Sequence, residues 1–324
     1  IEQSFFSVRT EDLEVSFCDY GASIYSIKYK DTYITYAPKN KQDFINIDYY
    51  GKIVGRCPGR IAEGKINVDG KVYQLQVNEP EKDNSLHGGA DCFSVRKFKR
   101  YIEDRIDAYV ISFNYVSPAN EAGYPELLDC WVTYTVYKDE AVIDTQIFAK
   151  STGVTPVNIT NHPYFRLANT GNILNHELTI PANQRASYDD SKLRITGLEG
   201  VGGDFDFQEA KLIGEDIEAV KEICPTAAGY DHLWKFTTSG LNTVTLKNPS
   251  TNLKLEVTTD ANGVCLYTDN YPKDNLLMVS NDYDDYHRAV AIEPQSYFKA
   301  KDTSMLNIDP ETPFSSYISY KISD

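Results

Sequence analysis

The sequence lacks the features that mark membrane-spanning and nucleic-acid-binding proteins. Among its 324 residues, no run approaches the ~18 consecutive apolar residues of a membrane-spanning helix. Basic residues are the minority, with 32 Lys and Arg against 47 Asp and Glu, and the formal net charge is −15. A field of this sign repels phosphate backbones and anionic lipid headgroups. We therefore expect neither nucleic acid nor a membrane surface as a partner.

The cysteines form no dense framework, and no C-x-x-C pair occurs. The six are Cys18, Cys57, Cys92, Cys130, Cys224 and Cys265. Cysteines spread singly along a chain of this length are typical of reduced thiols. The first residues show neither the basic region nor the apolar segment of a secretory leader. We expect a cytoplasmic protein.

Cofactor and hydrolase motifs are also missing. Residues 59–65 match the G-x-x-x-x-G-K of a phosphate-binding loop, but Ile66 stands where Mg²⁺ requires a hydroxyl group. No second histidine follows His176-Glu177 at the spacing of a zinc site, and neither G-x-S-x-G nor G-x-G-x-x-G occurs. The sequence predicts no metal and no cofactor.

The patterns that are present favour strands. Apolar and polar residues alternate over residues 73–77, 132–136, 253–257 and 318–322, which is typical of half-buried strands. Asp69-Gly70 predicts a tight hairpin turn. Helical spacing is convincing only over residues 209–223, where Ile213, Ile217, Val220 and Ile223 share one face. Linkers and repeats are absent. We expect an all-β fold, a large antiparallel β-sandwich with very little helix, formed by residues 1–324 as a single domain.

Three segments hold residues suited to chemistry. His87 is followed by Gly88 and Gly89, which allow close approach of a ligand but also suit a simple tight turn. His162 and Glu293 each precede a proline, which confines the residue before it to extended conformations. Glu293 also ends an apolar run, so its carboxylate is either paired or functional. His162 and Glu293 are therefore candidate proton-transfer groups.

Two further segments carry charged residues whose roles stay open at this level. Asp231 precedes His232, a pairing that occurs as a loop hydrogen bond as well as in sites. Arg56 and Arg60 flank Cys57-Pro58-Gly59, and an arginine in so acidic a chain calls for an ionic or hydroxyl-rich partner.

Taken in order, these segments resemble the motif series of aldose 1-epimerases, the galactose mutarotases. The similarity runs from Asp19 to the C-terminal strand. The motifs are Gly55-Arg56 through Arg60-Ile61-Ala62, Leu86-His87-Gly88-Gly89, Asn161-His162-Pro163-Tyr164-Phe165, Gly229-Tyr230-Asp231-His232 and Ile292-Glu293-Pro294-Gln295. Five motifs in the same order are far more specific than any one of them.

The resemblance implies a β-supersandwich and the cofactor-free interconversion of the α and β anomers of free hexoses such as D-galactose and D-glucose. It implies that His162 protonates the ring oxygen as general acid and that Glu293 takes the anomeric proton as general base. Arg60, His87 and Asp231 would hold the ring oxygen and hydroxyl groups of this monosaccharide. A net negative field would favour the protonated form of His162.

The sequence departs from the family pattern at three places. Gly59 stands where an Asn is common, Cys265 replaces a sugar-contacting Gln, and residues 296–299 replace Pro-Asp-Ala. A thiol is a weaker hydrogen-bonding group than an amide. Cys265 nevertheless remains a candidate for substrate binding, as does Asn84, and the departures leave the preferred sugar open.

Other functions are compatible with parts of this pattern. A relative acting on a hexose 6-phosphate would need arginines around the pocket, for which Arg96, Arg100 and Arg166 are the candidates. A glycoside hydrolase would use Asp231 and Glu293 as paired carboxylates. A non-catalytic sugar-binding protein would have lost the acid or the base. The 24 tyrosines suit pleated surfaces, and a share in sugar stacking is open.

Overall fold

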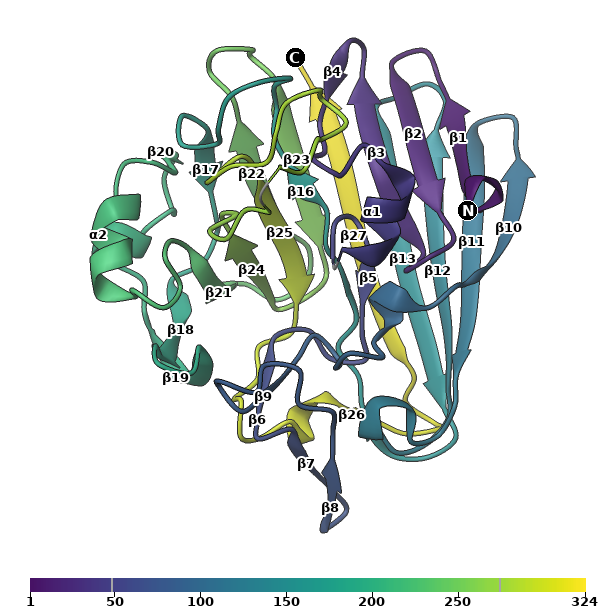
Figure 1. The fold of residues 1–324 in the computed structure, drawn as a ribbon, viewed down its shortest axis with the longest axis vertical. Helices are drawn as coiled ribbons and strands as arrows, with labels where there is room; N and C mark the ends of the chain where they lie inside the picture. The colour runs from purple at the N-terminus through teal and green to yellow at the C-terminus, as the bar shows by residue number, and fades with distance from the viewer. Residues whose placement is uncertain (48, 274) are drawn as a thin grey trace.

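Two antiparallel sheets form most of the fold in the computed structural model, which describes residues 1–47, 49–273 and 275–324 (Figure 1). The larger sheet has the order β10 (Lys99–Asp104), β11 (Ala108–Ser117), β12 (Leu128–Tyr137), β13 (Val142–Ser151), β27 (Phe314–Ser323), β23 (Lys254–Thr259), β22 (Asn242–Lys247), β17 (Glu177–Thr179) and β20 (Lys211–Leu212). The smaller sheet has the order β16 (Tyr164–Phe165), β25 (Val290–Gln295), β24 (Gly263–Tyr267), β21 (Asp231–Lys235), β18 (Gln184–Asp189) and β19 (Arg194–Gly200).

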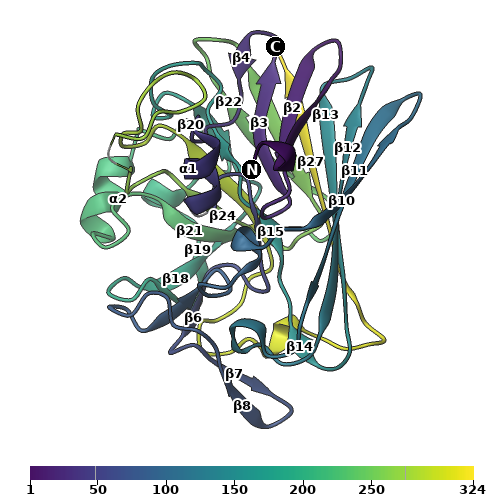
Figure 2. The same cartoon turned by 45° about the vertical axis from the view of Figure 1, so that its right-hand side comes forward.

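Shorter strands complete the architecture. A four-stranded sheet follows chain order, with β1 (Phe5–Arg9), β2 (Leu13–Cys18), β3 (Ser23–Tyr29) and β4 (Thr32–Tyr33). Four pairs remain: β5 (Ile53–Val54) with β15 (Thr160–Asn161), β6 (Arg60–Ala62) with β9 (Asn84–Leu86), β7 (Lys65–Val68) with β8 (Lys71–Gln74), and β14 (Thr155–Pro156) with β26 (Asn307–Ile308). In Figure 2, β10 to β13 run along the right-hand side, and β18, β19 and β21 lie on the left.

The main apolar core lies on the inner face of the larger sheet, which packs against the smaller sheet and the four-stranded sheet. It contains Val132 and Tyr134 from β12 together with Leu266 from β24 and Ile292 from β25, all of them fully buried. Every second residue of β12 is buried along its whole length, as the sequence alternation predicts for a sheet with one face on the core. The predicted all-β sandwich is thus confirmed.

Strand predictions hold best where both neighbouring strands are present. Residues 132–136 fall on β12 and residues 318–322 on β27, and the segment 253–257 falls on β23 except for its first residue. The segment 73–77 is only partly strand, because β8 ends at Gln74 and the amide of Leu75 donates to the carbonyl of Gly64 instead. The predicted hairpin turn is present, with φ values of 51° at Asp69 and 79° at Gly70.

The helix predicted over residues 209–223 is wrong in its first half. The helix α2 spans only Ile217–Ile223, while Lys211–Leu212 form β20 and pair with β17. The amide of Gly214 donates to the carbonyl of Leu174, which extends this edge contact, and glycine is a poor helix former. Ile213 is buried as expected but reaches the core from a strand edge.

Sequence periodicity also missed a second helix, α1 (Lys41–Asn46). Its start is set by Asn40, whose side chain accepts hydrogen bonds from the amides of Gln42 and Asp43. Among the described residues, no helix has the length and apolar character needed to cross a membrane.

Candidate active site

A cavity of about 590 Å³ opens on the face of the smaller sheet that points away from the main core. The alternation of side chains along three neighbouring strands builds this face. Asp231 and Leu233 line the cavity from β21, Cys265 and Tyr267 line it from β24, and Glu293 and Gln295 line it from β25. The neighbouring residues Val264, Leu266 and Ile292 point to the opposite face and belong to the core. The same alternation that buries the core therefore presents polar groups to the cavity.

His162 and Glu293 meet in this cavity. Their Nε2 and Oε1 atoms are 3.2 Å apart, and each side chain is 3% exposed. His162 lies between β15 and β16, and its amide donates to the carbonyl of Lys52 while its own carbonyl accepts from the amide of Gly51. Neither His162 Nδ1 nor Glu293 Oε2 has a hydrogen-bond partner among the described residues. The pair is thus rigidly held and has unused hydrogen-bonding capacity.

Burial decides the protonation of the pair. It lowers the pKa of His162 to about 4. Burial, with a smaller effect from the charge of Asp231, raises the pKa of Glu293 well above its usual value. The expectation that the acidic field favours protonated His162 is wrong, because the loss of hydration by a buried imidazolium outweighs a distributed charge. A single proton shared by the pair is favoured on Glu293.

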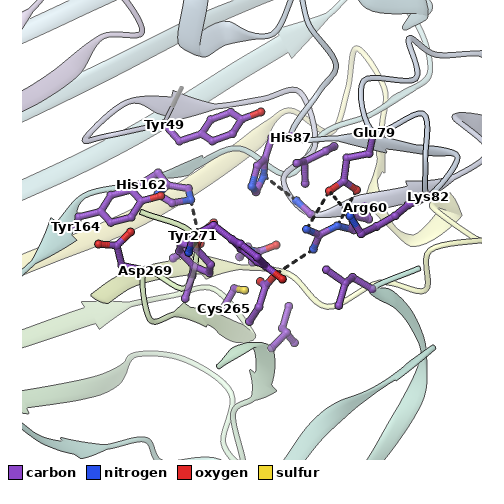
Figure 3. Close-up of a pocket in the computed structure, with 18 of the residues that line it drawn as sticks. Tyr49, Arg60, Glu79, Lys82, His87, His162, Tyr164, Cys265, Asp269 and Tyr271 are labelled. Atoms are coloured by element: carbon purple, nitrogen blue, oxygen red, sulfur yellow. Dashed lines mark hydrogen bonds and ion pairs between the residues drawn. The ribbon is translucent and has the colours of Figure 1, made fainter. Parts of the chain in front are cut away.

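Two tyrosine rings enclose the imidazole of His162. The ring of Tyr164 stacks on it at 5.1 Å between centroids, and the ring of Tyr49 stacks at 5.7 Å. Figure 3 shows His162 beside Tyr164, with Tyr49 above. The sequence motif contains Tyr164, but no local signal marks Tyr49, which the fold brings in from a distant segment. These contacts limit the imidazole to one orientation.

His87 faces the same cavity as a hydrogen-bond donor. The amide of Gly59 donates to His87 Nδ1 at 3.1 Å, so the neutral ring carries its hydrogen on Nε2. Burial, together with the charges of His162 and Arg60, lowers the pKa of His87 well below its usual value. Gly88 is required here because a Cβ atom would lie 2.1 Å from the carbonyl oxygen of Gly55.

The arrangement of His87, His162 and Glu293 invites a test for metal binding. Their ligand atoms lie within 4.8 Å of one another, which is close enough for a divalent cation. A cation at His87 would need the lone pair of Nε2, but the hydrogen bond from Gly59 places a hydrogen there. The donor set therefore suits a hydroxyl or ring oxygen better than a metal ion.

Arg60 is held between two carboxylates. Its Nε lies 2.8 Å from Glu79 Oε2, and its Nη1 lies 3.2 Å from Asp231 Oδ2. Burial acts to lower the pKa of Arg60, but the charges of Asp231 and Glu79 outweigh it and raise the pKa. Figure 3 shows Arg60 and Glu79 together, with Lys82 next to them. Glu79 is a site residue that sequence reasoning missed, because it stands in no motif.

Of the two remaining substrate-binding candidates, Cys265 lines the cavity and Asn84 lies behind its wall. Cys265 lines the cavity and lies directly opposite Glu293 in the pairing of β24 with β25. Asn84 is fully buried and is not among the cavity-lining residues. Its Nδ2 donates to Glu79 Oε2 at 3.1 Å, and its Oδ1 accepts from Arg194 Nε at 2.7 Å. The structure thus corrects the expected position of Asn84, which supports Glu79 from behind.

Several other residues from the sequence motifs have structural partners. His232 points to the opposite face of β21 from Asp231, and its Nδ1 accepts the amide hydrogen of Asp231. Arg56 is buried and donates to the carbonyls of Pro125 and Glu126. All six cysteines are free.

The arginines that a sugar phosphate would require lie elsewhere. Arg96 pairs with Asp91 and Glu121, Arg100 pairs with Asp19, and Arg166 pairs with Asp282. The cavity-lining cations among the described residues are Arg60, Lys82 and Lys273.

Comparison with known proteins gives a consistent result. A family model described as aldose 1-epimerase matches residues 5–311. The chain is 30% identical to the galactose mutarotase of Rattus norvegicus and 31% identical to that of Sus scrofa, in each case over 90% of this chain and 85% of the relative. A solved galactose 1-epimerase from Lactobacillus acidophilus superposes with a TM-score of 0.88 at 21% identity, covering 98% of this chain and 93% of that one.

Proposed function

Because the chain belongs to the aldose 1-epimerase family, we propose that it interconverts the α and β anomers of free hexoses, with D-galactose and D-glucose as the first candidates. The observation that carries this proposal is the buried pair of His162 and Glu293, whose facing atoms are 3.2 Å apart. Each member has a second polar atom without a partner among the described residues. A sugar hydroxyl and a ring oxygen supply the missing partners.

The pair accounts for mutarotation through one shared proton. Ring opening requires a proton on the ring oxygen and removal of the proton from the anomeric hydroxyl, which is work for one acid and one base. The shared proton first passes from Glu293 to Nε2 of His162 across their 3.2 Å contact, which makes His162 the acid and Glu293 the base. Ring opening then leaves a proton on Glu293. After rotation about C1–C2, Glu293 returns the proton to the carbonyl oxygen and His162 takes back the one on the ring oxygen. The proton count of the pair is the same at the start and at the end.

The surrounding residues are assigned by position. We propose that Arg60, His87 and Asp231 hold the ring oxygen and hydroxyl groups, since all three line the cavity. Glu79 fixes the guanidinium of Arg60, and Asn84 fixes Glu79. The chemistry needs only an acid and a base, so we propose neither a metal nor an organic cofactor.

The charge balance of the cavity favours a neutral sugar. Arg60 is compensated by two carboxylates within 3.2 Å, which leaves little attraction for a substrate phosphate. Lys82 and Lys273 also line the cavity, but Lys82 lies 4.0 Å from Glu79, and the carboxyl groups of Asp269 and Glu293 belong to the same lining. We therefore propose a free monosaccharide rather than a sugar phosphate as the substrate.

The test is polarimetry of freshly dissolved α-D-galactose and α-D-glucose. The protein is expected to accelerate the approach to the equilibrium rotation, whereas an unchanged rate with both sugars would refute the proposal. Cys265→Gln restores the amide that is usual in the family. Because a net hydrogen bond contributes about 0.5–1.5 kcal/mol, we expect KM to fall by about two-fold to ten-fold for the preferred sugar.

We also propose that the protein works in a reducing compartment, the cytoplasm. Six free cysteines, five of them buried, support this location.

A further inference from the structure

One carboxyl group of the cavity is not used by the mechanism. Asp269 follows β24, lines the cavity and is 2% exposed. Its Oδ2 atom has no hydrogen-bond partner among the described residues. In Figure 3, Asp269 lies on the side of His162 and Tyr164, whereas Arg60, Glu79 and Lys82 lie on the other side. A charged or polar side chain therefore stands at each end of the cavity, with Asp269 at the end where His162 lies and Arg60 at the other.

The backbone around Asp269 is fixed on both sides. The hydroxyl group of Thr268 donates to Asn270 Oδ1, and Asn270 Nδ2 donates to the carbonyls of Ala227 and Tyr230. The amide of His287 donates to the carbonyl oxygen of Asp269 itself. These contacts hold the backbone that carries the carboxyl group in place before any ligand binds, which is the arrangement expected of a binding residue.

The packing of the protein does not explain this carboxyl group. Asp269 has a φ of +49°, a left-handed conformation that Asn, Asp and Gly accept more readily than other residues. Asn or Gly would therefore satisfy the backbone equally well. Burial and the charge of Asp284 raise the pKa of Asp269 well above its usual value, which shows that the group is poorly solvated. A buried carboxyl oxygen without a partner is costly unless something binds it.

We propose that Asp269 is a substrate-binding residue that hydrogen-bonds a hydroxyl group of the monosaccharide at the end of the cavity opposite Arg60. The inference rests on the proposed function and extends it from the reacting centre to the recognition of a remote hydroxyl. A carboxyl group in either protonation state can bind a hydroxyl, which acts as donor or acceptor.

The test compares Asp269→Asn and Asp269→Gly with the wild type by polarimetry, using galactose, glucose and their singly deoxygenated analogues. Both substitutions suit the positive φ, so the fold is preserved. Because a net hydrogen bond contributes about 0.5–1.5 kcal/mol, we expect KM for the parent sugar to rise by about two-fold to ten-fold in Asp269→Gly, with kcat changed far less. For the one deoxy sugar that lacks the contacted hydroxyl, wild type and variant are expected to have equal KM values.

Asp284→Asn is the matched control. Asp284 is a neighbouring buried carboxyl group that accepts the amide of Lys273 at 2.6 Å and does not line the cavity. Because a carboxyl group in either protonation state binds a hydroxyl, loss of the Asp284 charge is expected to change KM far less than Asp269→Gly does, for every sugar. Equal KM values for Asp269→Gly and the wild type with all parent sugars would overturn the inference while leaving the proposed function intact. A wild type that neither binds nor converts any of the sugars would overturn both.

Discussion

At the scale of single residues, the protonation of His162 and Glu293 determines when the enzyme can work. Catalysis needs one proton on the pair, so activity is lost when the pair gains a second proton or loses its last one. Burial lowers the pKa of His162 to about 4 and raises that of Glu293 well above its usual value. Both shifts widen the pH range over which the pair holds a single proton.

The pH dependence of kcat/KM follows from these shifts. With Glu293 protonated, the second proton goes to His162, so we expect the acid limb of the profile near pH 4 rather than near the ~6.5 of an ordinary histidine. Polarimetry at substrate concentrations below KM gives kcat/KM at each pH and so measures this limb. Circular dichroism at the same pH values excludes acid unfolding. An acid limb at the ordinary histidine value would show that burial does not control His162.

At the scale of elements, the two arginines that flank residues 57–59 have different roles, one in the fold and one in the cavity. Arg56 precedes β6 and donates to carbonyls of the chain between β11 and β12, whereas Arg60 begins β6 and faces the cavity. The sequence predicts a partner for each arginine but does not distinguish a structural partner from a substrate group. Only the folded chain shows which acceptors each guanidinium meets.

Substitution by methionine separates these tasks. Arg56→Met leaves several buried carbonyl groups unpaired and is expected to lower the free energy of unfolding by about 2–4 kcal/mol, with kcat/KM of the folded protein little changed. Arg60→Met is expected to lower kcat/KM by at least about ten-fold. Urea unfolding and polarimetry measure the two effects, and a reversed pattern would contradict the assignment.

How much of the site could be predicted from the sequence depends on whether a residue stands in a motif. His162, Glu293, Arg60 and Asp231 are found because each stands in a motif. Arg60 and Asp231 begin strands, His162 lies between two strands, and Glu293 lies within β25. Glu79, Tyr49 and Asp269 reach the cavity through long-range packing. Their neighbouring residues form no motif from which this position could be predicted. Likewise, the protonation of His162 depends on burial, which net charge does not report.

Strands and helices are likewise predicted well only where the local sequence pattern agrees with the long-range pairing. The strand residues 132–136 are predicted well because their alternation extends over a whole sheet face. The segment 209–216 is not, because residues 211–214 pair with distant backbone around β17, and this overrides a helical spacing that is locally plausible.

At the scale of the whole molecule, the strand β27 near the end of the chain lies in the middle of the larger sheet. β27 lies between β13 and β23, so the last residues of the chain join two segments that are more than a hundred residues apart. We propose on this basis that residues 1–324 fold as a single unit around one core.

Removal of β27 tests this proposal. A chain ending at Pro313 would expose the edges of β13 and β23 and the apolar face that Ile318 and Tyr320 cover, so we expect it to lose cooperative folding. Scanning calorimetry of the full chain is expected to show one transition. Two separate transitions, or a truncated chain that keeps the full transition, would contradict a single unit.

A double-variant cycle tests whether His162 and Glu293 act as one proton-sharing pair. Initial polarimetric rates with α-D-galactose are measured for the wild type, His162→Asn, Glu293→Gln and the double variant. We expect a loss in kcat of about 10²–10⁴ for each single variant, and no further loss in the double variant, because either substitution disables the same proton exchange. A single variant with full activity, or losses that multiply in the double variant, would contradict it.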